Sequence, residues 1–250
     1  MINLHRLTDR IKQWWHYPQP SSEQRELLGL KTDSFDVDFT ARRLAAESSA
    51  EYLMNHMRQA RNFATDYDLH EAVRDWVTIP GHRLEFGVAT GRTIRHWARL
   101  WPNETIHGFD SFEGLPETWL WNIRQGHFAQ GLPEVPDNVQ LHKGWFDQTL
   151  PNWLENPGPI AFIHIDSDLY SSARYVLTTL KQRIVPGTVI VFDEYFNFPG
   201  WQQDEFRAWQ EFVAATKIEY EYLGFVSSHQ EVAVRVVKKP QNTKKNLHSS

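Results

Sequence analysis

The sequence contains no cysteine, which excludes disulfide bonds and thiolate metal ligands. This absence suits a reducing compartment, and we expect a cytoplasmic protein. No apolar run approaches the roughly 20 residues that a membrane-spanning helix needs. The N-terminal residues are also too polar for the apolar centre of a signal peptide. We therefore expect no membrane partner.

Positive charge is also scarce. The 250-residue chain has 26 Lys and Arg against 31 Asp and Glu, and its formal net charge of -5 argues against a nucleic-acid partner. Hydrophobic residues, by contrast, make up 41% of the chain, which is enough for a globular core. The 11 Trp residues are an unusual number and suggest pockets or an interface in addition to core packing.

The apolar pattern divides the chain into three regions. Residues 1–80 read as helical, because apolar residues such as Leu53 and Met57 recur at helical spacing. We expect a helical N-terminal extension that closes over a site or mediates dimerisation, so homo-oligomerisation stays open. Residues 81–237 form the main domain, and the polar, basic tail 238–250 is predicted to be disordered.

The main domain alternates short apolar runs with helix-like segments. Nearly continuous runs such as IAFIHI and TVIVF suit strands buried on both faces, and segments 93–100 and 172–183 suit the covering helices. This alternation predicts an α/β fold with a mainly parallel sheet and helices on both faces. The last two runs lack a helix between them and predict an antiparallel hairpin. The expected strands are 83–88, 105–109, 139–142, 160–165, 188–192, 219–223 and 231–237.

The first chemical motif is EFGVATG, which runs from Glu85 to Gly91 at a strand end and opens a helix. Glycines there allow a tight turn and the close approach of a ligand. Asp110 ends the next strand, where a carboxylate can accept hydrogen bonds from both ribose hydroxyls of a nucleoside. Together these features predict a nucleoside site. The alternative is that Gly87 and Gly91 form only a tight turn.

The residues between the glycines help to choose the nucleoside. Ala89 and Thr90 crowd the position where a dinucleotide rests its pyrophosphate, which disfavours an NAD-dependent oxidoreductase. S-adenosylmethionine has no phosphate, and Glu85 is expected near its ammonium group. S-adenosylmethionine is therefore the favoured cofactor.

Two further segments follow strand ends. One is GFDSFEGLPE, which contains Ser111, and the other is KGWFDQTLP, in which Trp145 or Phe146 is placed to stack on an adenine ring. The alternative is that these aromatic side chains only plug the top of the sheet.

Acidic residues follow the fourth and fifth expected strands, in IDSD and in FDEY. Parallel strands end at the same edge of a sheet, so we expect Asp166, Asp193 and Glu194 to converge there. Crowded carboxylates repel each other unless a cation neutralises them, and oxygen ligands suit Mg²⁺, Mn²⁺ or Ca²⁺. The alternative is that these acids cap helices or pair with Arg or Lys.

Three histidines, His107, His142 and His164, alternate with apolar residues in the expected strands. We expect them to be buried histidines with satisfied hydrogen bonds. His164 neighbours the acidic residues, and its side chain is expected on the face opposite to that of Asp166.

The blocks EFGVATG, GFDSFEGLPE, GWFDQTLP, IDSDLYSS, VPGTVIVFDEY and FPGW resemble, in this order, the macrocin O-methyltransferase family, across residues 82–213. Members are class I methyltransferases that act mainly on sugars of natural products. The resemblance implies a Rossmann-like seven-stranded sheet with Glu85, Gly87 and Asp110 at the cofactor. It also implies Mg²⁺ bound by Asp166 and an acidic pair, which is Asp193-Glu194 here where the family usually has two aspartates.

The second acid of the IDSD block, Asp168, is similar to the family's general base. The alternative is that Asp168 makes a structural hydrogen bond to the start of the following helix. We therefore expect an S-adenosylmethionine-dependent O-methyltransferase, assisted by Mg²⁺ or Mn²⁺, whose acceptor is a small-molecule hydroxyl, possibly of a sugar. A non-catalytic nucleoside-binding module and an NAD-dependent oxidoreductase are the alternatives. The residues expected at the cofactor are Glu85, Gly87, Ala89, Thr90, Gly91, Asp110, Ser111, Trp145, Phe146 and Asp166.

Overall fold

The computed structural model describes residues 37–121 and 123–238, and the chain divides into two compact units, residues 1–43 and 44–250. Apart from the start of α3, all the described elements belong to the second unit. The elements in chain order are α3 (Val37–His56), β1 (Arg61–Phe63), α4 (Asp66–Trp76), β2 (His82–Phe86), α5 (Arg92–Leu100), β3 (Ile106–Asp110), β4 (Val139–Lys143), α6 (Phe146–Trp153), β5 (Ile160–Ile165), α7 (Tyr170–Leu180), β6 (Ile184–Phe192), the 3-10 helix η1 (Trp201–Gln203), α8 (Glu205–Thr216), β7 (Glu219–Val226) and β8 (Val232–Lys238).

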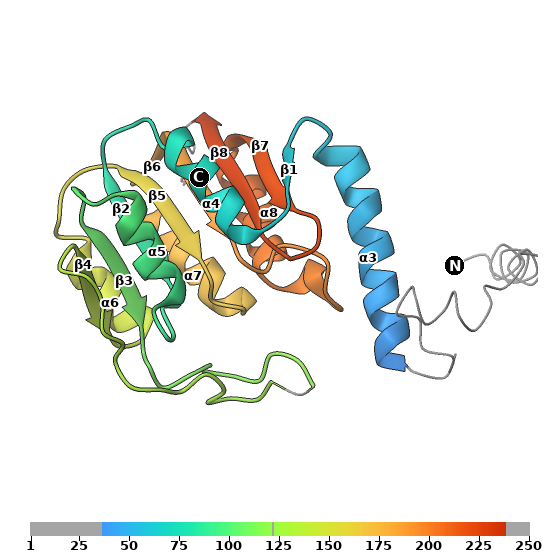
Figure 1. Ribbon diagram of the computed structural model, residues 1–250, viewed down its shortest axis with the longest axis horizontal. Helices are drawn as coiled ribbons and strands as arrows, with labels where there is room; N and C mark the ends of the chain where they lie inside the picture. Colours follow the sequence, from blue (N-terminus) through green and yellow to red (C-terminus); the bar gives the residue numbers. More distant parts are fainter. Residues whose placement is uncertain (1–36, 122, 239–250) are drawn as a thin grey trace, which may run out of the picture. The chain divides into compact units, whose positions relative to one another are not determined.

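The strands form one sheet in the order β1-β7-β8-β6-β5-β2-β3-β4 (Figure 1). All neighbouring pairs are parallel except those made by β8, which runs antiparallel to both β6 and β7. The seven expected strands are all present, and β7 and β8 form the expected antiparallel hairpin. Two of the predicted features, the α/β class and the mainly parallel sheet, are therefore confirmed.

Side chains on the central strands alternate between two apolar cores, as the period of two in a strand requires. On β5, Ile163 and Ile165 join the core that contains the buried faces of α7 and α8, whereas Phe162 joins the core that contains α4 and α5. Helices thus cover both faces of the sheet, which explains why the central strands read as continuous apolar runs.

The N-terminal region differs from its prediction as a purely helical extension. Helix α3 ends at His56, and residues 61–63 form β1, which pairs in parallel with β7 and adds an eighth strand at the sheet edge. A three-residue strand is too short to show a period of two, so the sequence pattern could not reveal it. Residues 1–36 of the predicted extension and residues 239–250 of the predicted disordered tail lie outside the described residues.

None of the helices in the two described stretches is long and apolar enough to cross a membrane.

Gly108 in β3 lets α5 approach the sheet closely. A Cβ atom at Gly108 would lie 2.4 Å from Cδ1 of Ile94 in α5 and 2.8 Å from Cγ2 of Val88. Both distances are shorter than van der Waals contact, so the side chains of Ile94 and Val88 would have to shift to make room for a methyl group.

We expect Gly108→Ala to lower the free energy of unfolding by about 1–3 kcal/mol because it overpacks this contact. Urea unfolding of the two proteins measures the difference. Gly131→Ala is the matched control, since a Cβ there would meet no atom within 4 Å. Equal stability of the Gly108→Ala and Gly131→Ala proteins would show that the contact has room for a methyl group.

Candidate functional site

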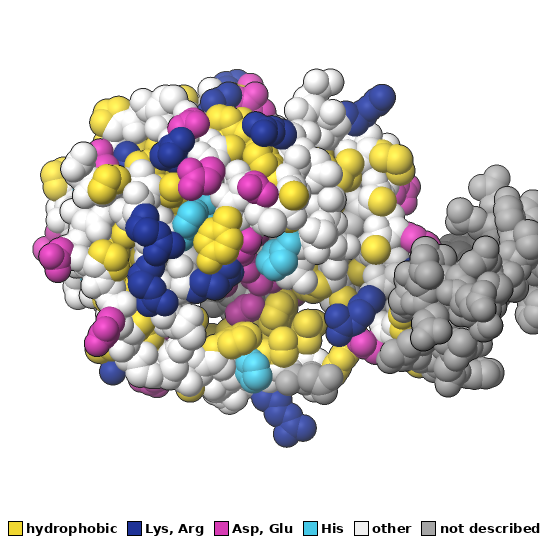
Figure 2. Space-filling model, in the orientation of Figure 1, with side chains coloured by type: hydrophobic (Ala, Val, Ile, Leu, Met, Phe, Trp, Pro, Cys, Tyr) yellow, Lys and Arg dark blue, Asp and Glu magenta, His cyan; other side chains and the backbone are white. Residues whose placement is uncertain are grey.

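A pocket of about 590 Å³ opens at the carboxyl ends of the parallel strands. It lies where the strand order reverses, beside β2 and β5, which is the usual ligand position in such sheets. Acidic side chains are visible in a hollow bordered by hydrophobic side chains (Figure 2). The residues singled out from the sequence that line this pocket are Gly87, Ala89, Asp110, Ser111, Trp145, Phe146, Asp166, Asp168, Asp193 and Glu194.

Gly87 brings the ends of β2 and β5 into direct backbone contact. Its φ of +92° lies in the left-handed region, and a Cβ atom there would be only 1.6 Å from the carbonyl oxygen of Asp166. No other residue fits this position. The glycine therefore sets how closely the loop after β2 approaches the first acidic residue of the pocket.

Asp110, at the end of β3, organises the loop that follows β2. Its Oδ2 accepts hydrogen bonds from the backbone N–H groups of Val88 and Ala89, both at 2.8 Å, and its Oδ1 accepts one from Phe112 N at 2.7 Å. Ala89 is held at a φ of +46° in this loop. A carboxylate can accept about four hydrogen bonds, so little capacity remains for ribose hydroxyls. The predicted ribose contact stays a prediction.

Trp145 and Phe146 are partly buried at the pocket wall, at the start of α6. The Phe146 ring meets Phe86 edge to face at 5.3 Å between centroids, which fixes its plane. Ser111 is turned into its own loop, where its Oγ accepts from Glu113 N at 3.0 Å. Both aromatic rings therefore line the pocket, and their stacking on an adenine ring stays a prediction.

Three predicted cofactor residues, Glu85, Thr90 and Gly91, do not line the pocket. The prediction that Glu85 faces an ammonium group is wrong for this structure, because its side chain is 0% exposed. Thr93 donates to its Oε1 at 3.0 Å, and His164 Nδ1 lies 3.1 Å from its Oε2. Gly91 instead forms the N-cap of α5. The carboxylate is held below the pocket floor by partners within the chain.

The predicted metal ligands do meet in the pocket wall. Burial, and then repulsion by Asp193, raises the pKa of Asp166 and of Glu194 well above the usual range. Burial also acts on Asp193, but hydrogen bonding from Glu194 and attraction to His164 outweigh it and lower its pKa. Two oxygens of the group, Asp193 Oδ1 and Glu194 Oε2, are buried without a hydrogen-bond partner.

The prediction that His164 faces away from Asp166 is wrong. Residues two apart in a strand lie on the same face, and the structure brings potential ligand atoms of His164, Asp166 and Asp193 to within 4.8 Å of one another. The unpaired Nε2 of His164 is buried and lies 4.0 Å from Asp193 Oδ1. The side chain of His164 therefore lies beside the acidic cluster and not on the opposite face of the strand.

Of the other two strand histidines, His107 is buried as predicted, whereas His142 is only partly buried. His107 Nδ1 and His142 Nε2 lie 3.2 Å apart and can share a hydrogen bond. Burial, and then repulsion by His142, lowers the pKa of His107 to about 4, so the ring is neutral near pH 7. Neither residue of this pair lines the pocket.

Asp168 combines an unusual backbone with a shifted pKa. Its φ of +59° is in the left-handed region, which costs a non-glycine residue free energy and is common at functional sites. Its side chain is only 8% exposed and lines the pocket. Burial, followed by repulsion from Asp193 and Asp204, raises its pKa to about 7. A carboxylate with that pKa is suited to proton transfer near neutral pH.

Glu205, the first residue of α8, ties the two acidic loops together. Its Oε1 accepts from Ser167 N at 3.0 Å, after β5, and its Oε2 accepts from Glu194 N at 3.3 Å, after β6. The side chain is fully buried. Sequence reasoning missed this residue, because it lies remote from both strand ends and belongs to no acidic motif. It fixes the separation of the loops that carry the predicted ligands.

Residues 84–195 match a family model described as a methyltransferase domain. The calicheamicin methyltransferase CalS11 has 23% sequence identity and a TM-score of 0.54, covering 87% of this chain and 99% of that chain. The O-methyltransferase NovP has 19% identity and a TM-score of 0.53, covering 82% of this chain and 100% of that chain. The fold is therefore the Rossmann-like α/β fold of class I methyltransferases, as predicted.

Two relatives are similar in sequence. The 8-demethyl-8-(2,3-dimethoxy-alpha-L-rhamnosyl)-tetracenomycin-C 4'-O-methyltransferase of Streptomyces olivaceus is 32% identical over 153 residues, which cover 47% of this chain and 54% of that protein. The demethyldecarbamoylnovobiocin O-methyltransferase of Streptomyces niveus is 27% identical over 176 residues, which cover 56% of this chain and 64% of that protein. The chain thus spans somewhat more than half the length of these relatives.

We expect Glu205→Gln to lower the free energy of unfolding by about 1–3 kcal/mol, because the amide NH₂ cannot accept the backbone N–H that faces it. Chemical unfolding monitored by Trp fluorescence measures the change. Glu211→Gln lies on the same helix with a 47% exposed side chain and serves as control, with a change within about 0.5 kcal/mol. Equal effects of the two substitutions would mean that Glu205 does not hold the acidic loops.

Proposed function

We propose that the chain is an O-methyltransferase that moves the methyl group of S-adenosylmethionine to a hydroxyl oxygen of a small molecule. The observation that carries this proposal is one pocket that joins a glycine loop of nucleoside-binding type to four carboxylates. Those carboxylates are Asp166, Asp168, Asp193 and Glu194. The matched methyltransferase model and the fold support the same reaction class.

The pocket residues fit a nucleoside with an amino-acid tail. The backbone of Gly87 and Ala89 lines the pocket, where it can approach a ligand closely, and hydrogen bonds to Asp110 hold their loop in place. The rings of Trp145 and Phe146 offer faces on which an adenine ring can stack. When bound, S-adenosylmethionine supplies an electrophilic methyl group and a good leaving group. The residues of the chain then contribute mainly alignment of the acceptor oxygen with that methyl group.

Asp166, Asp193 and Glu194 would hold Mg²⁺ or Mn²⁺. The fit rests on the oxygen donors, on their mutual repulsion, and on the buried oxygens of Asp193 and Glu194 that lack partners. A bound divalent cation would neutralise these carboxylates and favour the deprotonated form of an acceptor hydroxyl. Glutamate at 194 keeps the donor chemistry of the aspartate that is usual in the macrocin O-methyltransferase family.

Asp168 accepts the proton of the acceptor hydroxyl. It lies in the pocket wall beside the predicted ligands, and its raised pKa lets it hold a proton that a strongly acidic carboxylate would release. The proton can then pass to solvent, because the pocket is open.

The acceptor class follows from the relatives. The names of both describe O-methyltransferases of natural products, and one names a rhamnosyl group. We infer that this chain methylates a hydroxyl on a sugar or a sugar-bearing metabolite and belongs with the macrocin O-methyltransferases. Polar side chains suited to such an acceptor line the pocket near the carboxylates, at Ser167, Ser171 and Ser172.

We expect S-adenosylhomocysteine to raise the melting temperature of the protein and NAD to leave it unchanged. With Mg²⁺ present, we expect radiolabelled methyl transfer to a panel of glycosylated natural products.

Asp166→Ala should abolish metal-dependent turnover because it removes a proposed metal ligand. Full activity of Asp166→Ala in the presence of a chelator would contradict the metal role, and stabilisation by NAD alone would contradict the proposed cofactor.

Asp168→Asn should lower kcat by about 100-fold or more, because the amide cannot take the proton of the hydroxyl. Binding of S-adenosylhomocysteine, measured by calorimetry, should stay unchanged. Asp137→Asn, on the exposed surface, should leave kcat unchanged. An unaltered kcat in Asp168→Asn would remove this residue from the mechanism.

A further inference from the structure

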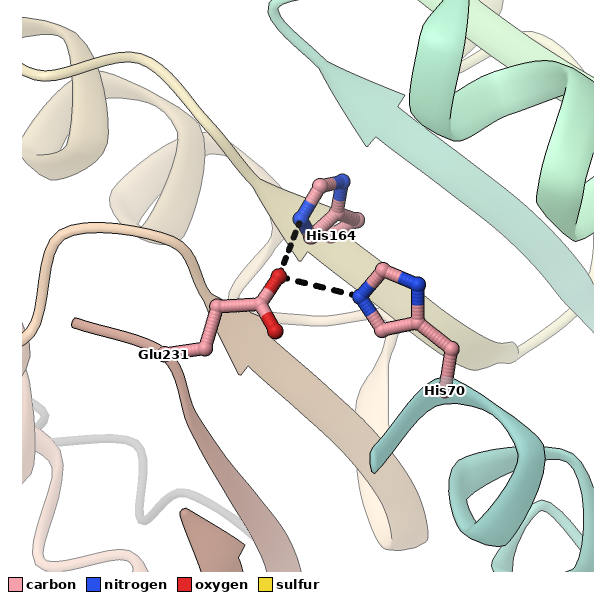
Figure 3. Close-up of side chains that lie close together, drawn as sticks. All are labelled: His70, His164 and Glu231. Atoms are coloured by element: carbon pink, nitrogen blue, oxygen red, sulfur yellow. Dashed lines mark hydrogen bonds and ion pairs between the residues drawn. The ribbon is translucent and has the colours of Figure 1, made fainter. Parts of the chain in front are cut away.

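A second cluster of ligand-type side chains lies beneath the pocket floor. His70 lies in α4, His164 lies in β5, and Glu231 immediately precedes β8. All three residues are 0% exposed. The two imidazole rings flank the Glu231 carboxylate, and both face the same oxygen (Figure 3). Three elements that are distant in the sequence therefore meet at one carboxylate.

The donor atoms are close enough to share one ion. His70 Nε2 lies 2.9 Å and His164 Nε2 lies 3.9 Å from Glu231 Oε1, and all three ligand atoms lie within 4.8 Å of one another. Metal bonds of about 2.0–2.2 Å to nitrogen and oxygen put neighbouring donors roughly 3–3.5 Å apart. The observed separations bracket this range, so only small side-chain movements are needed.

His164 has the orientation of a metal ligand. Its Nδ1 lies 3.1 Å from Glu85 Oε2, and Thr93 donates to the other oxygen of Glu85. With its Nδ1–H donated to this carboxylate, the ring turns the lone pair of Nε2 toward Glu231. A carboxylate that holds one ring nitrogen while the other binds the metal is the usual arrangement at histidine metal sites.

The cluster leaves several buried polar atoms unsatisfied. Within the cluster these are His164 Nε2, His70 Nδ1 and Glu231 Oε2. Each buried polar atom without a partner costs about 1–3 kcal/mol. Throughout residues 37–121 and 123–238, the ion pairs of Glu85, Asp193 and Glu231 are all with histidine. A cation bound by Nε2 of both rings and by the Glu231 carboxylate would give His164 Nε2 a partner and offset the buried negative charge, while His70 Nδ1 would keep its N–H unpaired.

We propose that His70, His164 and Glu231 form a structural site for a divalent transition-metal ion of the Zn²⁺ class, distinct from the pocket. Two imidazole nitrogens and one carboxylate oxygen suit Zn²⁺, Co²⁺ or Fe²⁺ better than Mg²⁺, which prefers oxygen ligands. The ion links α4, β5 and β8 under the acidic pocket. This inference does not depend on the methyl-transfer reaction.

The test uses the untagged full-length chain, expressed with added Zn²⁺ and then dialysed against EDTA. Because the ligands are fully buried, the protein should retain about one zinc ion per chain, measured by mass spectrometry of the metal. X-ray absorption at the zinc edge should show two imidazole ligands. Wild-type protein without retained zinc, or zinc without imidazole ligands, would overturn the proposal even if every variant failed to fold.

Variants then assign the ligands. His70→Gln and Glu231→Gln should each lower Zn²⁺ affinity by more than the roughly 10–100-fold expected when Glu85→Gln removes the carboxylate behind His164. Asp166→Asn and Glu194→Gln change only the pocket carboxylates, and His142→Gln changes a histidine that pairs with no carboxylate. These three should keep the zinc. If Asp166→Asn lost the zinc while Glu231→Gln retained it, the ion would be bound by the pocket carboxylates and the proposal would be overturned.

Discussion

The repulsion among carboxylates that are held out of water at one sheet edge is the constraint on which the rest of the structure depends. Asp166, Asp193 and Glu194 are brought together because parallel strands end at the same edge, and Glu205 fixes the loops that carry them. Such a group is unfavourable unless a cation or protons neutralise it. This edge of the sheet is therefore suited to bind positive charge, and the proposed sulfonium cofactor would lie in the same field.

Much of the fold could be read from the sequence because its strands are buried on both faces. A strand such as Ile160–Ile165 is apolar at nearly every position, and its neighbours follow the same pattern. Because parallel strands end at the same edge of a sheet, the sequence also predicted that Asp166 and Asp193 would line the same pocket. The sequence marked Gly87 as part of a tight turn near a ligand, but the contact of its backbone with the carbonyl of Asp166 could be seen only in the structure.

The remaining parts of the site could not be read because they depend on side-chain direction or on contacts distant in the sequence. Glu85 is a strand residue, and its direction below the pocket follows from the register of β2 against β5. No local motif marks the segment that brings Glu205 to the pocket loops. The same is true of the segments that bring His70 and Glu231 to the cluster beside the pocket. The prediction for His164 was wrong because residues two apart in a strand, such as His164 and Asp166, lie on the same face and not on opposite faces. Strand β1 was missed because three residues show no pattern.

The most direct test of the central claim is a crystal structure with S-adenosylhomocysteine and Mn²⁺, in which anomalous scattering locates both the sulfur and the metal. The account predicts the sulfur in the pocket and facing Asp168, with manganese bound by Asp166, Asp193 and Glu194. Cofactor bound at another face of the sheet, or carboxylates that remain without any cation while the cofactor is in place, would contradict it.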